Sequence, residues 1–143
     1  MEKHIEDLSK YRFNKANDCL NIAKKLFEGG ELGYAQNRAY YAVFDAIRSI
    51  TVLDGFDSSK HSGIISYFNQ TYVKTGIFKP EVSKIIRLAS MLREKSDYED
   101  FYIPDNQDTE HVIQMVEQFL NYVRAYLISK SISLWRIDPL WHN

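Results

Sequence analysis

The chain has 143 residues, of which 45% are hydrophobic and 26% charged, and this size and composition predict one domain with its own hydrophobic core. Its formal net charge of −1 gives no overall electrostatic reason to expect a nucleic-acid partner, although a local basic patch is not excluded. The single cysteine excludes an internal disulfide, and no apolar run approaches the roughly 20 residues of a transmembrane helix, so we expect a cytoplasmic protein without a membrane partner.

Hydrophobic periodicity and helix-ending residues predict five helices and no strand. The predicted helices cover residues 3–28, 32–53, 60–73, 80–97 and 108–130. Two glycines end the first helix, and a proline opens the fourth. Long helices with short connections predict an all-α fold, an antiparallel bundle of four to five helices. We expect residues 1–130 to form this helical domain and residues 131–143 to be a C-terminal tail of unknown role.

The second predicted helix contains the segment NRAYYAVFDAI, residues 37–47, and has two different faces. Placing each residue 100° after the last gathers alanines, Val43 and Ile50 on one face, which we expect to pack against neighbouring helices. The opposite face gathers polar and aromatic residues: Tyr34, Asn37, Arg38, Tyr41, Asp45 and Arg48. We therefore expect the adjacent tyrosines to differ, with Tyr40 packing in the core and Tyr41 on the polar face.

Two arginines fall within apolar helix faces, Arg12 in the first helix and Arg93 in the fourth. A charge in such a place is costly unless it is paired. One interpretation is that both side chains extend to water at the edge of the core. The other is a polar network with Asp45, Asp97 and the tyrosines, either within one chain or between two. The sequence leaves both interpretations open.

His61 opens the third predicted helix, in the sequence KHSG. The unpaired backbone N–H groups at this helix start, with the neighbouring Lys60, are suited to hold an anion such as phosphate. A histidine that only caps or packs explains the same pattern.

The sequence predicts no metal site and no cofactor. Its four histidines lack the spacing of metal ligands, and only one cysteine is present. The HExxH, P-loop and GxGxxG motifs are absent as well.

Four ordered elements, NRAYYAVF, KHSG, YVKTG and the LR…SDY segment, resemble the small stand-alone HEPN-domain proteins of bacteria and archaea. The resemblance covers roughly residues 5 to 125. It implies an all-α bundle that forms a homodimer. It also implies a partner, a small nucleotidyltransferase encoded nearby, in toxin–antitoxin or defence modules.

Many HEPN proteins are metal-independent RNases whose motif is an arginine followed about four to six residues later by a histidine. Arg93 corresponds to that arginine, but Tyr98 stands five positions after it, and no histidine follows within reach. Histidine can transfer a proton near neutral pH, whereas an unperturbed tyrosine does not, so RNase activity is in doubt. His61 is the other candidate for the missing imidazole. Arg136 and His142 in the tail match the spacing of the arginine–histidine motif. A proline interrupts this segment, so we regard the match as chance.

Three hypotheses follow. The first is a homodimer that binds a nucleotide, RNA or a nucleotidyltransferase partner. Its groove is lined by Asn37, Arg38, Tyr41, Asp45, Lys60, His61, Arg93, Asp97 and Tyr98. The second is an RNase toxin whose catalytic candidates are Arg93, Tyr98 and His61. The third is a dimeric adaptor without catalysis. The resemblance also makes Tyr98 and Tyr102 the candidates for nucleotidylation by a partner enzyme.

Overall fold

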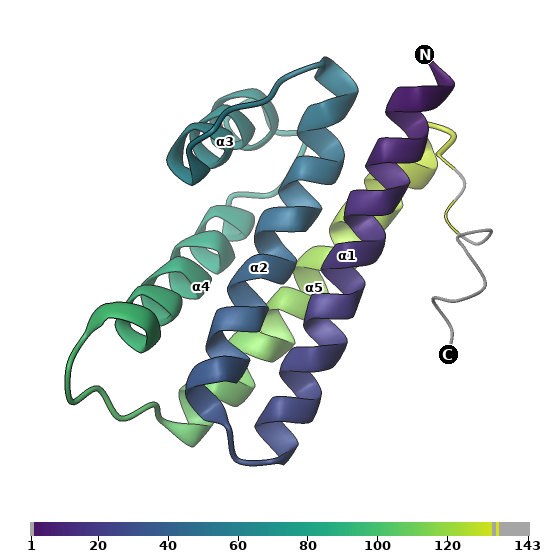
Figure 1. Cartoon of the computed structure of the whole chain (residues 1–143). Helices are drawn as coiled ribbons and strands as arrows, with labels where there is room; N and C mark the ends of the chain where they lie inside the picture. The colour runs from purple at the N-terminus through teal and green to yellow at the C-terminus, as the bar shows by residue number, and fades with distance from the viewer. Residues whose placement is uncertain (1, 133, 135–143) are drawn as a thin grey trace.

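A computed structural model describes residues 2–132 and residue 134 of the chain, and this part is all-α (Figure 1). The helices are α1 (Lys3–Glu28), α2 (Leu32–Thr51), α3 (His61–Phe68), α4 (Glu81–Tyr98) and α5 (Asn106–Ser129). A 3₁₀ turn, Val52–Asp54, follows α2, and a π-helical turn, Asn69–Val73, follows α3. No strand occurs in the described residues, so the predicted fold class is confirmed.

Local capping groups set the ends of the long helices. After α1, Gly30 has a φ of 80°, a left-handed conformation that glycine adopts at little cost, and the Glu31 N–H donates to the Leu26 carbonyl at 2.8 Å. At the start of α5, the Asp105 carboxylate accepts a hydrogen bond from the Asp108 N–H at 2.9 Å. This cap begins α5 at residue 106, two residues before the predicted start.

Helix α2 is the centre of the bundle. It lies beside α1 and α4, with α5 behind it and α3 crossing near its C-terminal end (Figure 1). Its small-residue stripe, Ala35, Ala39, Ala42 and Ala46, is fully buried. Side chains this small let several helices approach one axis, which explains why α2 contacts all four of the others.

The α1–α2 turn and the α4–α5 loop lie at the same end of the bundle (Figure 1). Both connections lie there because α1 and α4 run toward this end and α2 and α5 run away from it. At the end of α5, Ile132 donates its N–H to the Leu127 carbonyl at 3.0 Å, and its side chain is buried in the core. None of the helices formed by the described residues is both long and apolar enough to cross a membrane.

Candidate functional site

Arg93, near the end of α4, is the centre of a cluster that joins α4 to α2. Its Nε donates to Asp97 Oδ2 at 3.0 Å, and its Nη2 donates to the hydroxyls of Tyr41 and Tyr98 at 3.2 Å each. The guanidinium carbon lies 5.0, 5.5 and 5.3 Å from the ring centroids of Tyr40, Tyr41 and Tyr98, within cation–π distance. Of the two interpretations of Arg93, the structure therefore supports the polar network.

Asn37 and Arg38 extend this cluster along α2. Asn37 Nδ2 donates to both carboxylate oxygens of Asp97, at 3.2 and 3.0 Å, and Arg38 Nε donates to Asn37 Oδ1 at 3.0 Å. The Arg38 guanidinium lies 4.9 Å from the Tyr41 ring centroid. Asp97 is thus occupied by two donors, so it orients Arg93 rather than serving as a free base. We call Arg93, Asp97, Tyr98, Asn37, Arg38 and Tyr41 the Arg93 cluster.

His61, the first residue of α3, reaches this cluster through Tyr40. Tyr40 is buried, as expected, and its hydroxyl forms a 3.0 Å hydrogen bond with His61 Nδ1. The imidazole is stacked on Phe44 at 4.0 Å between ring centroids. Burial, followed by the positive charges of Arg93 and Arg48, lowers the pKa of His61 below its ordinary value. The imidazole is therefore packed and neutral at pH 7, and it lies against the same tyrosine ring as Arg93.

Asp45 belongs to a neighbouring cluster between α1 and α2. It is buried, and its Oδ2 lies 3.9 Å from the Cys19 sulfur, which lies 4.0 Å from Arg38 Nη1. Burial raises the pKa of Asp45, while Lys15, Arg48 and Arg38 oppose that rise. Burial and the Asp45 charge likewise raise the pKa of the Cys19 thiol. Asp45 is therefore connected to the edge of the Arg93 cluster through Cys19, which contacts Arg38.

Arg12 does not pair with either predicted carboxylate. Its Nη1 makes a long 3.5 Å hydrogen bond to the Arg48 carbonyl oxygen. Burial and the charge of Arg48 lower the pKa of Arg12. Its partner is thus the backbone of α2, an arrangement that neither interpretation of the sequence specified.

The two candidate tyrosines for modification differ in access. Tyr98 is 71% exposed. Tyr102 is only partly exposed, and its hydroxyl donates to Gln36 Oε1 at 3.1 Å. Gln36 is 1% exposed, accepts a second hydrogen bond from Ser96 at 2.5 Å, and donates to Thr109 Oγ1 at 2.9 Å. The Tyr102 phenol is therefore fixed to the bundle, whereas the Tyr98 phenol is accessible.

Comparison with known proteins identifies the chain's relatives. The family model of the HEPN domain matches residues 9–126. The chain belongs to the HEPN family. A UPF0332 protein of Thermotoga maritima is 31% identical over 122 residues, covering 85% of this chain and 92% of the relative.

Two archaeal relatives have names that refer to toxins. "Putative toxin MJ0142" of Methanocaldococcus jannaschii is 27% identical, over 82% of this HEPN chain and 80% of its own length. "Putative toxin MJ0605" of the same organism is 28% identical, over 89% of this chain and 94% of its own length.

In this HEPN chain the structure brings together most of the predicted groove residues, and it adds others. The six members of the Arg93 cluster are contiguous, and His61 adjoins them through Tyr40. Lys60 lies exposed at the start of α3, where its N–H donates to Ser58 Oγ at 3.2 Å. The additions are Tyr40, Phe44, Gln36 and Cys19. The sequence could have indicated Gln36 as a buried hydrogen-bonding residue, because it is a polar residue at the edge of the apolar face of α2.

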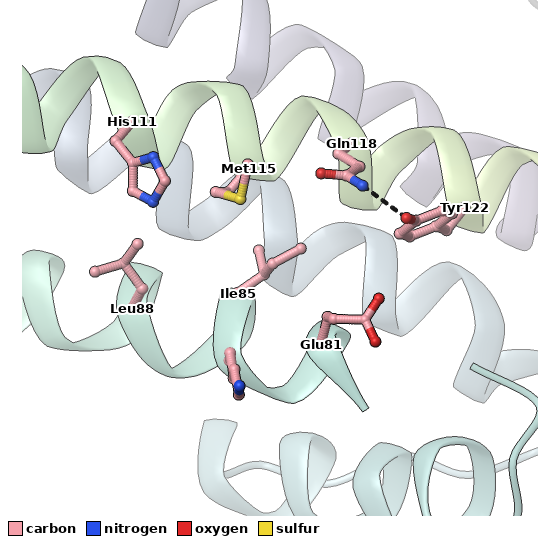
Figure 2. Close-up of a pocket in the computed structure, with 8 residues that line it drawn as sticks. Glu81, Ile85, Leu88, His111, Met115, Gln118 and Tyr122 are labelled. Atoms are coloured by element: carbon pink, nitrogen blue, oxygen red, sulfur yellow. Dashed lines mark hydrogen bonds between the residues drawn. The ribbon is translucent and has the colours of Figure 1, made fainter. Parts of the chain in front are cut away.

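A separate hollow of about 290 Å³ lies on the other flank of α4. Figure 2 shows Ile85 and Leu88 of α4 facing Met115 of α5 across it, with the Gln118–Tyr122 hydrogen bond of 2.6 Å at one side. None of its lining residues belongs to the Arg93 cluster. Within the described residues, no three His, Cys, Asp or Glu side chains come together as metal ligands.

The remaining candidate pair from the sequence is the Arg136 and His142 match. Both residues lie outside the described part of the chain.

Proposed function

We propose that this HEPN protein binds single-stranded RNA or a nucleotide at the Arg93 cluster, as part of a toxin-like module. The observation that carries the proposal is the pairing of one guanidinium with the accessible Tyr98 ring. Arginine binds phosphate oxygens, and tyrosine rings stack on unpaired bases. Although burial lowers the pKa of Arg93, the oxygens of Tyr41, Tyr98 and Asp97 outweigh it, and its pKa is raised, so the charge persists at every physiological pH.

RNA binding by purified protein tests this proposal. Fluorescence anisotropy of a labelled single-stranded RNA should show a dissociation constant at least about tenfold weaker for Arg93→Ala, a loss of about 1.4 kcal/mol. Arg87→Ala is the matched control, since Arg87 is an exposed arginine of the same helix. Equal binding by all three proteins would reject the Arg93 cluster as the site.

Metal-independent RNA cleavage is a second function, and it has one specific observation in its favour. His61 supplies an imidazole beside Tyr40, whose ring lies under the Arg93 guanidinium, although no histidine stands four to six residues after Arg93. A neutral imidazole can accept the 2′-hydroxyl proton, and an arginine can stabilise the charge that develops on the phosphate.

Incubation with RNA in the presence of EDTA distinguishes the two functions. Cleavage that is lost in both Arg93→Ala and His61→Ala would establish the RNase. RNA that is bound by the wild-type protein but remains intact would leave the binding function and exclude cleavage.

We further propose that the protein forms a homodimer in which the polar faces of α2 and α4 line the groove, and that a nucleotidyltransferase partner modifies Tyr98. The resemblance supports both parts, and the greater accessibility of the Tyr98 phenol, compared with the Tyr102 phenol, supports Tyr98 as the modified residue. Light scattering tests the dimer. Incubation with the partner enzyme and ATP, followed by mass spectrometry of the tyrosine peptides, tests the modification. A dimer that lacks any ligand or enzymatic activity would instead fit the adaptor hypothesis.

A further inference from the structure

The α4–α5 loop presents large apolar side chains to solvent. Phe101 is 100% exposed and Ile103 is 87% exposed, and both follow the accessible Tyr98. Single exposed apolar residues are ordinary on protein surfaces. Two within three residues of this loop, next to the exposed ring of Tyr98 at the end of α4, form a patch of the kind that marks an interaction site.

Two anchors that alternate with these residues along the chain hold the loop in place. Tyr102 is fixed by its hydrogen bond to the buried Gln36. Pro104 packs on the first turn of α2, where its Cγ lies 3.6 Å from the position of a Cβ on Gly33. Residues 102 and 104 therefore face the bundle and residues 101 and 103 face solvent, so the exposure is a consequence of a fixed backbone.

The surroundings of this patch are strongly acidic. Residues 94–110 contain seven Asp and Glu and one Lys, a formal charge of −6. The whole chain carries −1, so the remaining residues together carry +5. All seven acidic residues are at exposed positions, and of these Asp97 is paired with Arg93.

This charge decides between the classes of partner. A phosphate backbone would be repelled by the loop. A second copy docking through the same patch would place acidic segments against each other, because a two-fold contact pairs a surface with itself. A basic protein surface matches the charge, and apolar side chains at the centre of such a contact supply most of its affinity.

We propose that Phe101 and Ile103 anchor a protein partner whose contacting surface is basic, with the acidic residues of the α4–α5 loop around them. The proposal goes beyond RNA binding at the Arg93 cluster. It uses different residues, so either function can fail without the other.

The test uses three labelled probes: an amphipathic helical peptide of Lys and Leu, the matching peptide of Glu and Leu, and a single-stranded RNA. The Lys/Leu peptide should bind the wild-type protein at least about tenfold more tightly than it binds Phe101→Ser/Ile103→Ser or Glu99→Lys/Asp100→Lys. The Glu/Leu peptide should not bind. RNA affinity should remain within about twofold in the Ser variant, which leaves the loop charges unchanged.

Two control variants keep the result specific. Ile22→Ser/Ile128→Ser removes exposed apolar residues elsewhere, and Asp7→Lys reverses an exposed charge on α1. Both should bind the Lys/Leu peptide as the wild-type does, and circular dichroism should show that every variant is folded.

Three results would overturn the proposal. The first is equal Lys/Leu binding by wild-type and Phe101→Ser/Ile103→Ser, or no binding by the wild-type. The second is RNA binding that disappears with these two residues, which would make the loop a nucleic-acid site. The third is a wild-type dimer that becomes monomeric in the same variant by light scattering, which would make the occupant a second copy.

Discussion

The two faces of α2 are built in opposite ways. One face is a stripe of fully buried alanines that packs against the rest of the bundle. On the other face, Asn37 donates to Asp97 and Tyr41 accepts from Arg93. Arg38 lies beside them and contacts Asn37 and the Tyr41 ring. Burial and close packing stabilise the first face, whereas partly exposed ion pairs contribute little stability. We infer that α2 separates the part of the molecule that maintains the fold from the part that is available to bind a ligand.

Substitution on the alanine face should have the largest effect on stability. Ala42→Leu should reduce the free energy of unfolding by about 3 kcal/mol, because added carbons have no space at a fully buried position between helices. Urea denaturation measures the change. Ala125→Leu makes the same chemical change at an exposed helical position and should stay within about 0.5 kcal/mol of wild-type. Similar losses in both variants would contradict the division between the faces.

Gln36 lies at the border of the two faces and should have the next largest effect. Gln36→Leu removes the partner of Ser96, Tyr102 and Thr109, so we expect a loss of about 2 kcal/mol in unfolding free energy. Tyr102 is one anchor of the α4–α5 loop, so hydrogen exchange should accelerate at residues 99–105 more than in α1. Uniform acceleration across all helices would show that Gln36 serves the core and not the loop.

Arg93 should matter much less for stability than for binding. Arg93→Lys keeps the charge but cannot donate to Asp97, Tyr41 and Tyr98 with the same planar geometry. We expect a stability loss of about 0.5–1 kcal/mol, since the site is partly exposed, together with a clear loss of RNA affinity. A stability loss as large as that of Ala42→Leu would mean that the polar face also maintains the fold.

The sequence predicted the helices well because long amphipathic segments carry a strong periodic signal. It also placed Asn37, Arg38 and Tyr41 on one face, since spacing along a single helix follows from the helical repeat. It could not pair Tyr40 with His61, because that contact depends on how α3 crosses α2 after a connecting segment. The π-helical turn at 69–73 was likewise merged with the preceding helix, because a single wide turn hardly disturbs the hydrophobic pattern.

The smallest predicted effect is the pH dependence of stability contributed by His61, which contacts α2 through Tyr40 and Phe44. The pKa of His61 in the folded protein lies below its ordinary 6.5, because of burial first and then Arg93 and Arg48. Between the lowered pKa of the folded protein and 6.5, the unfolded chain therefore binds more protons than the folded protein does. The stability that the neutral imidazole contributes is complete above pH 6.5. It is lost as the pH falls from 6.5 to the folded-state pKa.

His61→Gln should flatten this part of the stability profile, measured by urea denaturation at a series of pH values. His111→Gln, at an exposed position on α5, is the control and should leave the profile unchanged. The pKa of Asp45 is raised by burial, so its contribution has the opposite sign, and it acts at lower pH, beginning near the ordinary carboxyl value of 3.8. A slope near 6.5 that persists in His61→Gln would mean that the imidazole is not held neutral against Tyr40 and Phe44, and its place beside Arg93 would then have to be reconsidered.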